Sequence, residues 1–181
     1  MSLQRTIGFV VCLMVLFAAA CGQGPDGGDE KEPVDATPDD TLDPQPLVGK
    51  VVINDMDTAI DHWGDDAYEL KTDGDGAPVI EDDTLTLTVS YSGGCKRHYF
   101  TIVADDEFLP MSDSVRLDTF LAHDANDDRC EAYLTAEYEF DLTPIKTLYQ
   151  ETYGRDAGTI HLHLQGQDVP EDVPVITYTF E

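Results

Sequence analysis

A strict alternation of apolar and polar residues over Thr84–Tyr91 (TLTLTVSY) constrains the fold of this chain more than any other feature. Successive side chains of a β-strand point to opposite faces, so this pattern predicts a strand that is buried on one side only. The buried face would carry Leu85, Leu87, Val89 and Tyr91.

Similar segments follow. The further strands expected are His98–Ala104, Val115–Ala122, Ala132–Phe140, Thr159–Leu164 and Val175–Phe180, with weaker ones at Lys50–Asn54 and Ala67–Leu70. Ser92-Gly93-Gly94 separates the first two strong strands, which predicts a hairpin across the glycines. One helix is expected, with Thr143 as N-cap, Pro144 at its first position and Gly154 at its end.

Seven or eight short strands with one short helix predict a mainly β fold. We expect a two-sheet antiparallel immunoglobulin-like sandwich, with a barrel as the alternative. It would occupy residues 47–181, which is enough chain for one core of ordinary size. The sequence shows neither an internal repeat nor a second domain boundary.

The first 20 residues have the parts of a secretory signal peptide. Arg5 precedes Ile7–Ala20, a stretch of 14 residues without charge, and small residues end it. Cys21 directly after Ala18-Ala19-Ala20 resembles the lipobox of bacterial lipoproteins, although Ala18 stands where that family usually has Leu. The resemblance implies cleavage before Cys21 and lipids on its sulfur and its new N-terminus. A retained transmembrane helix is the alternative, but it needs roughly 20 apolar residues.

Residues 21–46 are expected to form the lipidated cysteine and a disordered acidic linker. Gly22–Pro46 consists largely of Gly, Pro, Asp and Glu, and such a segment cannot bury enough apolar surface to offset its ordering entropy. Its prolines and its repelling charges favour extended conformers, so we expect a tether.

The chain is strongly acidic. It has 10 basic and 37 acidic residues, which give a formal net charge of −27. Nucleic acid is therefore not expected as a partner. The charge fits either attraction of cations and basic partners or a simple solvated coat, and the dispersal of the acids over loops favours the coat.

Two cysteines remain after Cys12, inside the signal, and Cys21 are set aside. An even pair in an exported chain predicts a disulfide between Cys95 and Cys130. The alternative is two free or metal-bound thiols. A bridge would bring Ser92–His98 (SGGCKRH) next to His123–Cys130 (HDANDDRC).

That juxtaposition gives the candidate site. The oxygen-bearing residues Asp124, Asn126 and Asp128 alternate as at the start of a calcium-binding loop, but Arg129 replaces the usual Gly and Thr135 the usual Glu. A second candidate is a zinc or copper site that combines the two cysteines with His98 and His123. The simplest interpretation is a disulfide-stapled turn with no cofactor, in which Asp and Asn side chains bond the backbone.

Other candidate chemistry is sparse. His161 and His163 are two apart on one strand and share a face, where they could hold a transition metal, although a pair without a third ligand is more typical of plain surface. Ser92-Gly93-Gly94-Cys95 joins two strands rather than a strand and a helix, so it is not a nucleophile elbow. We therefore expect no enzymatic activity and no catalytic residues.

Four segments together resemble uncharacterised bacterial lipoproteins, including the NigD-like group with a C-terminal β-sandwich. They are SYSGGCKRHYF, HDANDDRCEA, FDLTPIKTLYQETYG and GTIHLHL, within Thr84–Leu164. The resemblance implies a secreted sandwich with Cys95 and Cys130 paired, and it brings no catalytic residues.

The sequence thus predicts a lipid-anchored envelope protein, at the outer membrane or cell surface, with a binding or structural sandwich. Its partners would be the membrane, through the lipid on Cys21, and an unknown protein or small ligand. The alternative is a metal-binding module of the envelope, for calcium or a transition metal, built on Asp124, Asn126, Asp128, His98 and His123.

Overall fold

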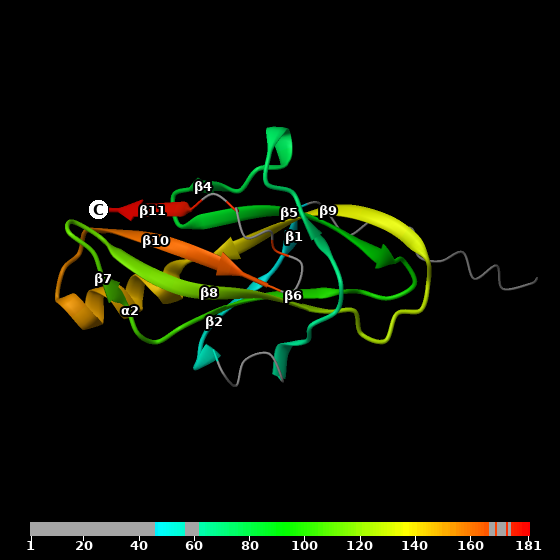
Figure 1. The fold of residues 1–181 in the computed structure, drawn as a ribbon, viewed down its shortest axis with the longest axis horizontal. Helices are drawn as coiled ribbons and strands as arrows, with labels where there is room; N and C mark the ends of the chain where they lie inside the picture. The colour runs from blue at the N-terminus through cyan, green and yellow to red at the C-terminus, as the bar shows by residue number, and fades with distance from the viewer. Residues whose placement is uncertain (1–45, 57–61, 167–168, 170–172, 174) are drawn as a thin grey trace, which may run out of the picture. The chain divides into compact units, whose positions relative to one another are not determined.

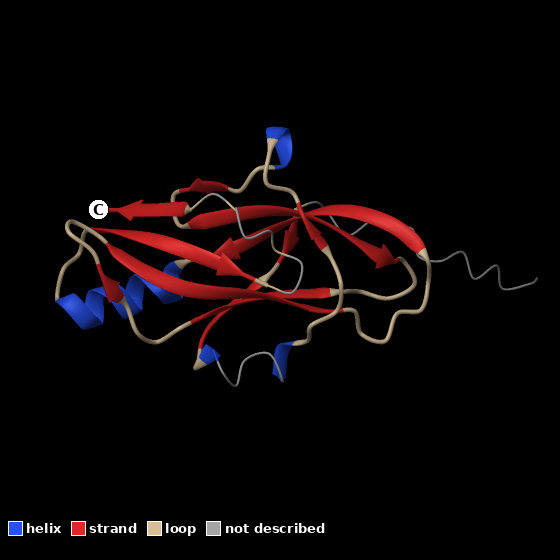
Figure 2. Cartoon of the chain, in the orientation of Figure 1, coloured by secondary structure: helices blue, strands red, loops and turns tan. Residues whose placement is uncertain are grey.

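The strands of the domain form two β-sheets in the computed structural model, which describes residues 46–56, 62–166, 169, 173 and 175–181 (Figures 1 and 2). The predicted signal peptide and almost all of the linker lie outside these residues, so their boundaries stay predictions. Within the described part of the chain, no helix is long and apolar enough to cross a membrane.

Each sheet is built from strands that are distant in sequence. The five-stranded sheet has the order β1 (Leu47–Val48), β9 (Ala132–Asp141), β5 (Thr84–Gly93) and β3 (Glu69–Leu70), and β4 (Val79–Glu81) also pairs with β5. The six-stranded sheet has the order β11 (Ile176–Phe180), β10 (Gly158–Gln165), β8 (Val115–Asp124), β6 (Tyr99–Ala104) and β2 (Lys50–Ile53), and β7 (Leu109–Pro110) pairs with β8. The short 3-10 helix η1 (Gly74–Gly76) precedes β4.

The expected mainly β fold with two sheets and one short helix is confirmed, but the sheets are mixed rather than antiparallel. β1 runs parallel to β9, β2 parallel to β6, and β10 parallel to β8. Parallel neighbours need a crossover connection. The crossover between the parallel strands β8 and β10 runs through β9 in the other sheet and then through helix α2 (Thr143–Tyr153).

The predicted hairpin between β5 and β6 is wrong. β5 pairs along its whole length with β9, with Thr84 opposite Asp141 and Gly93 opposite Ala132, whereas β6 pairs with β8. The glycines therefore mark a passage from one sheet to the other. Gly94 has a φ of 112°, which an L side chain rarely adopts, so glycine is needed at this passage.

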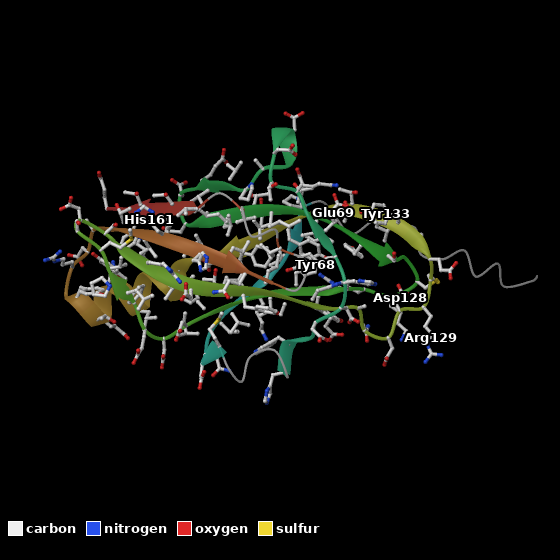
Figure 3. The ribbon with its side chains drawn as sticks, viewed as in Figure 1. Tyr68, Glu69, Asp128, Arg129, Tyr133 and His161 are labelled. Carbon is white, nitrogen blue, oxygen red and sulfur yellow. A yellow bond between two sulfur atoms is a disulfide. The ribbon has the colours of Figure 1, made fainter. Side chains whose placement is uncertain are left out.

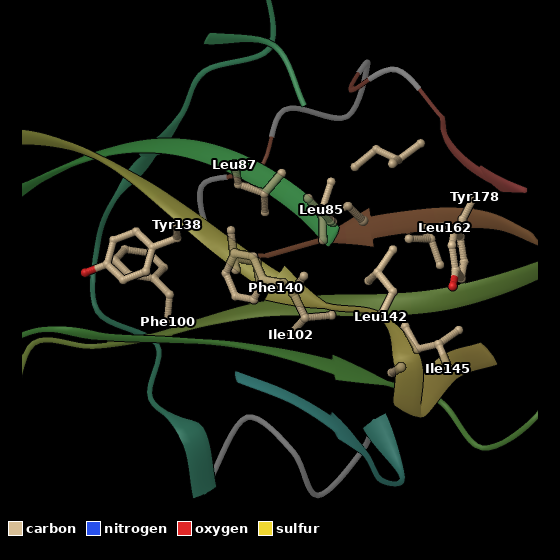
Figure 4. Packing of buried hydrophobic residues seen from close by; sticks show 14 of the residues in the cluster. Leu85, Leu87, Phe100, Ile102, Tyr138, Phe140, Leu142, Ile145, Leu162 and Tyr178 are labelled. Carbon is tan, nitrogen blue, oxygen red and sulfur yellow. The ribbon is translucent and has the colours of Figure 1, made fainter. Parts of the chain in front are cut away.

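The core lies where the inward faces of the sheets meet, as Figure 4 shows for Leu85, Leu87, Phe140 and Leu162. The alternation over β5 is confirmed, because its four predicted inward residues are at most 6% exposed. α2 adds Ile145 and Tyr149 to the same core.

Helix α2 begins differently from the prediction. Leu142 is its N-cap, and the Asp141 carboxylate accepts the Thr143 N–H at 2.9 Å, so an aspartate one residue earlier supplies the capping oxygen. The helix ends as expected at Gly154, which has a φ of 63°. Lys146 donates to both carboxylate oxygens of Asp83, at 3.2 and 3.0 Å, and so ties α2 to the turn before β5.

Candidate functional site

Two inter-strand connections meet where the sequence places its densest group of polar residues. The first leads from β5 to β6, and the second leads from β8 to β9. The Cys95–Cys130 disulfide joins them, with the two Cα atoms 5.8 Å apart. The predicted pairing of these cysteines is thus present, and it brings His98, His123 and Asp128 together.

Asp128 is the acceptor that holds the two connections. Its Oδ2 atom accepts the backbone N–H groups of Gly94, Cys95 and Lys96, each at 2.9 Å, and its Oδ1 accepts the N–H of Cys130 at 2.9 Å. Only 1% of the side chain is exposed. These donors hold the pKa of Asp128 far below its usual range, and the Cys130 N–H has the largest effect. Asp128, in the loop that leads into β9 (Figure 3), therefore stays a carboxylate.

A chain of hydrogen bonds runs from Asp128 through two stacked histidines. Asp128 Oδ2 lies 3.3 Å from His98 Nε2, and His98 Nδ1 lies 2.8 Å from His123 Nε2. His123 Nδ1 lies 3.1 Å from the Asp66 carbonyl oxygen. The two histidines are only 3% and 1% exposed.

The bonding pattern fixes the number of ring protons. Both ends of the chain are acceptors, the Asp128 carboxylate and the Asp66 carbonyl, so His98 Nε2 and His123 Nδ1 must each carry a proton to donate. The contact between His98 Nδ1 and His123 Nε2 needs one more. Two neutral rings carry two protons and leave one contact unsatisfied, whereas three protons satisfy all three contacts.

Both rings lie among aromatic side chains. His123 stacks on Phe100 with centroids 4.3 Å apart and planes at 8°, and Tyr68 meets its ring edge-on at 5.8 Å. Burial lowers the pKa of His123, which keeps its ring neutral. His98 stacks on Tyr91 at 4.5 Å. Each ring is thus enclosed by aromatic side chains as well as hydrogen-bonded.

The predicted calcium residues bond the loop itself. Asp124 Oδ1 accepts the Asn126 N–H at 2.7 Å, and the Asn126 amide donates to the Arg97 carbonyl at 3.4 Å. Asn126 and Asp127 have φ values of 55° and 53°, as in a tight turn of Asp and Asn residues. A calcium ion at Asp128 would compete with four N–H donors. Calcium binding stays a prediction.

A zinc or copper site on the cysteines faces a similar obstacle. Ligand atoms of Cys95, Asp128 and Cys130 lie within 4.8 Å of one another, but sulfur atoms bonded to each other are not thiolates. The ring nitrogens of His98 and His123 already bond each other, Asp128 and Asp66.

None of these contacts involves a hydroxyl or thiol nucleophile, so the group resembles an Asp–His dyad without the residue that such a dyad would activate. The absence of enzymatic activity remains a prediction.

Sequence reasoning missed the direct contact between the histidines and the part played by Asp66. A signal for the first was available, because the period of two places His123 on the same face of β8 as Leu117 and Leu121. The second depends on tertiary structure: Asp66 Oδ2 accepts the Ala125 N–H at 2.7 Å, and its backbone N–H donates to the His123 carbonyl at 3.0 Å.

Comparison with known proteins identifies similar solved structures. No family model matches the chain, and no curated protein matches it. A NigD-like immunity protein from Bacteroides caccae is 18% identical with a TM-score of 0.48, and the match covers 73% of this chain and 59% of that protein. A proposed lipoprotein from Bacteroides fragilis is 15% identical with a TM-score of 0.49, over 74% and 69% of the two chains. The chain thus spans less than two thirds of the NigD-like protein, and the matches include the group that its sequence motifs resemble.

Proposed function

We propose that this chain is a lipid-anchored protein of the bacterial cell envelope whose β-sandwich is a binding module. The observation that carries the proposal is the sequence Met1–Cys21, in which one cation and an uncharged stretch of 14 residues that ends in three alanines precede a cysteine. After cleavage before Cys21, the acidic linker would hold the sandwich at a distance from the membrane.

The described domain supports an extracytoplasmic location in one respect. Disulfides persist in oxidising compartments and are rare in the cytosol, and the Cys95–Cys130 bridge joins the two connections of the candidate site. The closed hydrogen-bonding of His98, His123 and Asp128 supports a structural role for that site, because the buried rings bond one another and offer no nucleophile. Binding would then use the exposed faces of the sandwich.

The test is metabolic labelling with an alkyne analogue of palmitate in a bacterial host that processes lipoproteins. We expect label on the wild-type chain and on Cys12→Ser, the matched control inside the signal, and no label on Cys21→Ser. Cys21→Ser should also accumulate as the longer, uncleaved precursor. Equal labelling of all three chains, or none in the wild type, would contradict the anchor.

Location is tested separately by membrane fractionation and by protease treatment of intact cells. The proposal expects the chain in the outer-membrane fraction, with the sandwich cleaved from whole cells if it faces outward. Recovery in the soluble fraction despite lipid labelling would contradict the location.

A further inference from the structure

The outward face of the six-stranded sheet has a hollow of about 370 Å³ that is separate from the candidate site. It is lined by Met111, Arg116, His161, His163, Val175 and Thr177. β10 supplies the histidines: Ile160, Leu162 and Leu164 of this strand face the core, and His161 and His163 point the other way. Figure 3 shows His161 on this strand, close to β11.

Both histidines are held through the same ring nitrogen. His161 Nδ1 lies 3.2 Å from Thr177 Oγ1, and His163 Nδ1 lies 2.9 Å from Asp118 Oδ1 and 3.3 Å from Gln165 Nε2. Among the described residues, neither Nε2 atom has a hydrogen-bond partner. Two imidazoles on one strand face therefore offer the same free nitrogen toward the same hollow.

Asp118 gives His163 the arrangement typical of a metal-binding histidine, in which a carboxylate accepts a proton from the ring nitrogen that does not bind the metal. Asp118 also pairs with Arg116, whose Nε and Nη2 lie 2.8 and 3.0 Å from its two oxygens. This pairing offsets the one cation that lines the hollow. Across the whole chain, the net charge of −27 attracts cations.

The donor types favour copper. Imidazole suits copper, nickel and zinc, and Cu²⁺ binds most tightly among the divalent ions of this series. Met111 is 54% exposed and brings a thioether to the same hollow, a soft donor that favours Cu⁺. Residues two apart on a strand have Cα atoms roughly 6.6 Å apart. Thr177 and Asp118 lie on the two strands that flank β10, so both rings must turn toward each other to place their Nε2 atoms about 2.0–2.1 Å from one ion.

We propose that His161 and His163 bind a copper ion through their Nε2 atoms, with Met111 as a third donor for the reduced ion. Water fills the remaining positions on Cu²⁺. This site does not depend on the lipid anchor, so its failure would leave the proposed function intact.

The experiment is calorimetric titration of the full chain, purified in detergent, with Cu²⁺, Ni²⁺ and Zn²⁺ separately. We expect Cu²⁺ to bind most tightly, and its electron paramagnetic resonance spectrum to show coupling to two imidazole nitrogens. His161→Gln and His163→Gln should each remove that two-nitrogen signal. The matched control is His62→Gln, an exposed histidine elsewhere in the chain, which should bind copper as the wild type does.

Two further variants separate ligands from supporting residues. Asp118→Asn should weaken Cu²⁺ binding by about tenfold to a hundredfold, the usual effect of losing a partner behind a ligand. Met111→Leu should weaken Cu⁺ binding, measured by competition with a chromogenic chelator, and leave Ni²⁺ binding unchanged.

The proposal is overturned if His161→Gln and His163→Gln bind copper like the wild type, because the ion would then sit elsewhere. It is also overturned if the wild type shows no copper binding at neutral pH. Circular dichroism melting of each variant checks folding, and the outward position of both rings, half-buried for His161 and exposed for His163, predicts melting temperatures close to that of the wild type.

Discussion

Loss of the Cys95–Cys130 disulfide should be one of the costliest changes to the domain. The bridge spans a sequence separation of 35 residues. In the chain-entropy model, closing a loop of this length restricts the unfolded chain by roughly 4 kcal/mol. The folded state should change little in Cys95→Ser/Cys130→Ser, because the four N–H bonds to Asp128 still hold the two connections.

The assay is guanidinium unfolding of the wild type and the double variant, followed by circular dichroism. We expect the free energy of unfolding to fall by about 3–4 kcal/mol and the melting temperature by roughly 10–20 °C. Wild-type protein reduced with dithiothreitol is the control, and it should match the double variant. A loss below about 1 kcal/mol, with an unchanged dependence on denaturant, would show instead that the bridge hardly restricts the unfolded chain.

Three further perturbations test the packing and the buried network. Because burial lowers the pKa of His123, the stability due to its neutral ring is present above about pH 6.5 and is lost as the pH falls through the folded pKa. His123→Gln should therefore reduce the loss of unfolding free energy between pH 7.5 and 5, measured from unfolding curves. A pH dependence equal to that of the wild type would contradict this expectation. Asp83 links β11 to α2, because it bonds the Tyr178 hydroxyl and Lys146, which both lower its pKa. Asp83→Asn should lower the free energy of unfolding by about 1–2 kcal/mol, measured by urea unfolding. An unchanged free energy of unfolding would contradict this link. Phe140 is fully buried, so Phe140→Ala should lower the free energy of unfolding by about 3–5 kcal/mol, and a cost near zero would contradict the packing described.

Local pattern was enough to predict most elements of the fold. The alternation over Thr84–Tyr91 and the residues Pro144 and Gly154 act through neighbours in sequence, and the structure has a strand and a helix there. The choice of strand partners could not be predicted in this way. Period-two alternation tells which face is buried but not which strand lies alongside, so β5 and β6 were expected as neighbours although they belong to different sheets.

The residues that meet at the candidate site could be predicted from the sequence, but the contacts between their atoms could not. The cysteine pair indicated that His98, His123 and Asp128 would meet, and they do. Which atoms face one another depends on the end of β8 and on Asp66, 57 residues from His123 in sequence. The stacking of the two rings and the direct contact between them follow only from those distances.

The most direct test of lipid anchoring is the mass of the N-terminal peptide of the protein extracted from bacterial membranes. Lipid anchoring predicts a peptide that begins at Cys21 and carries the mass of a diacylglycerol on the sulfur, with or without an acyl chain on the amine. A peptide that begins at Met1, or an unmodified Cys21, would contradict the lipid anchor.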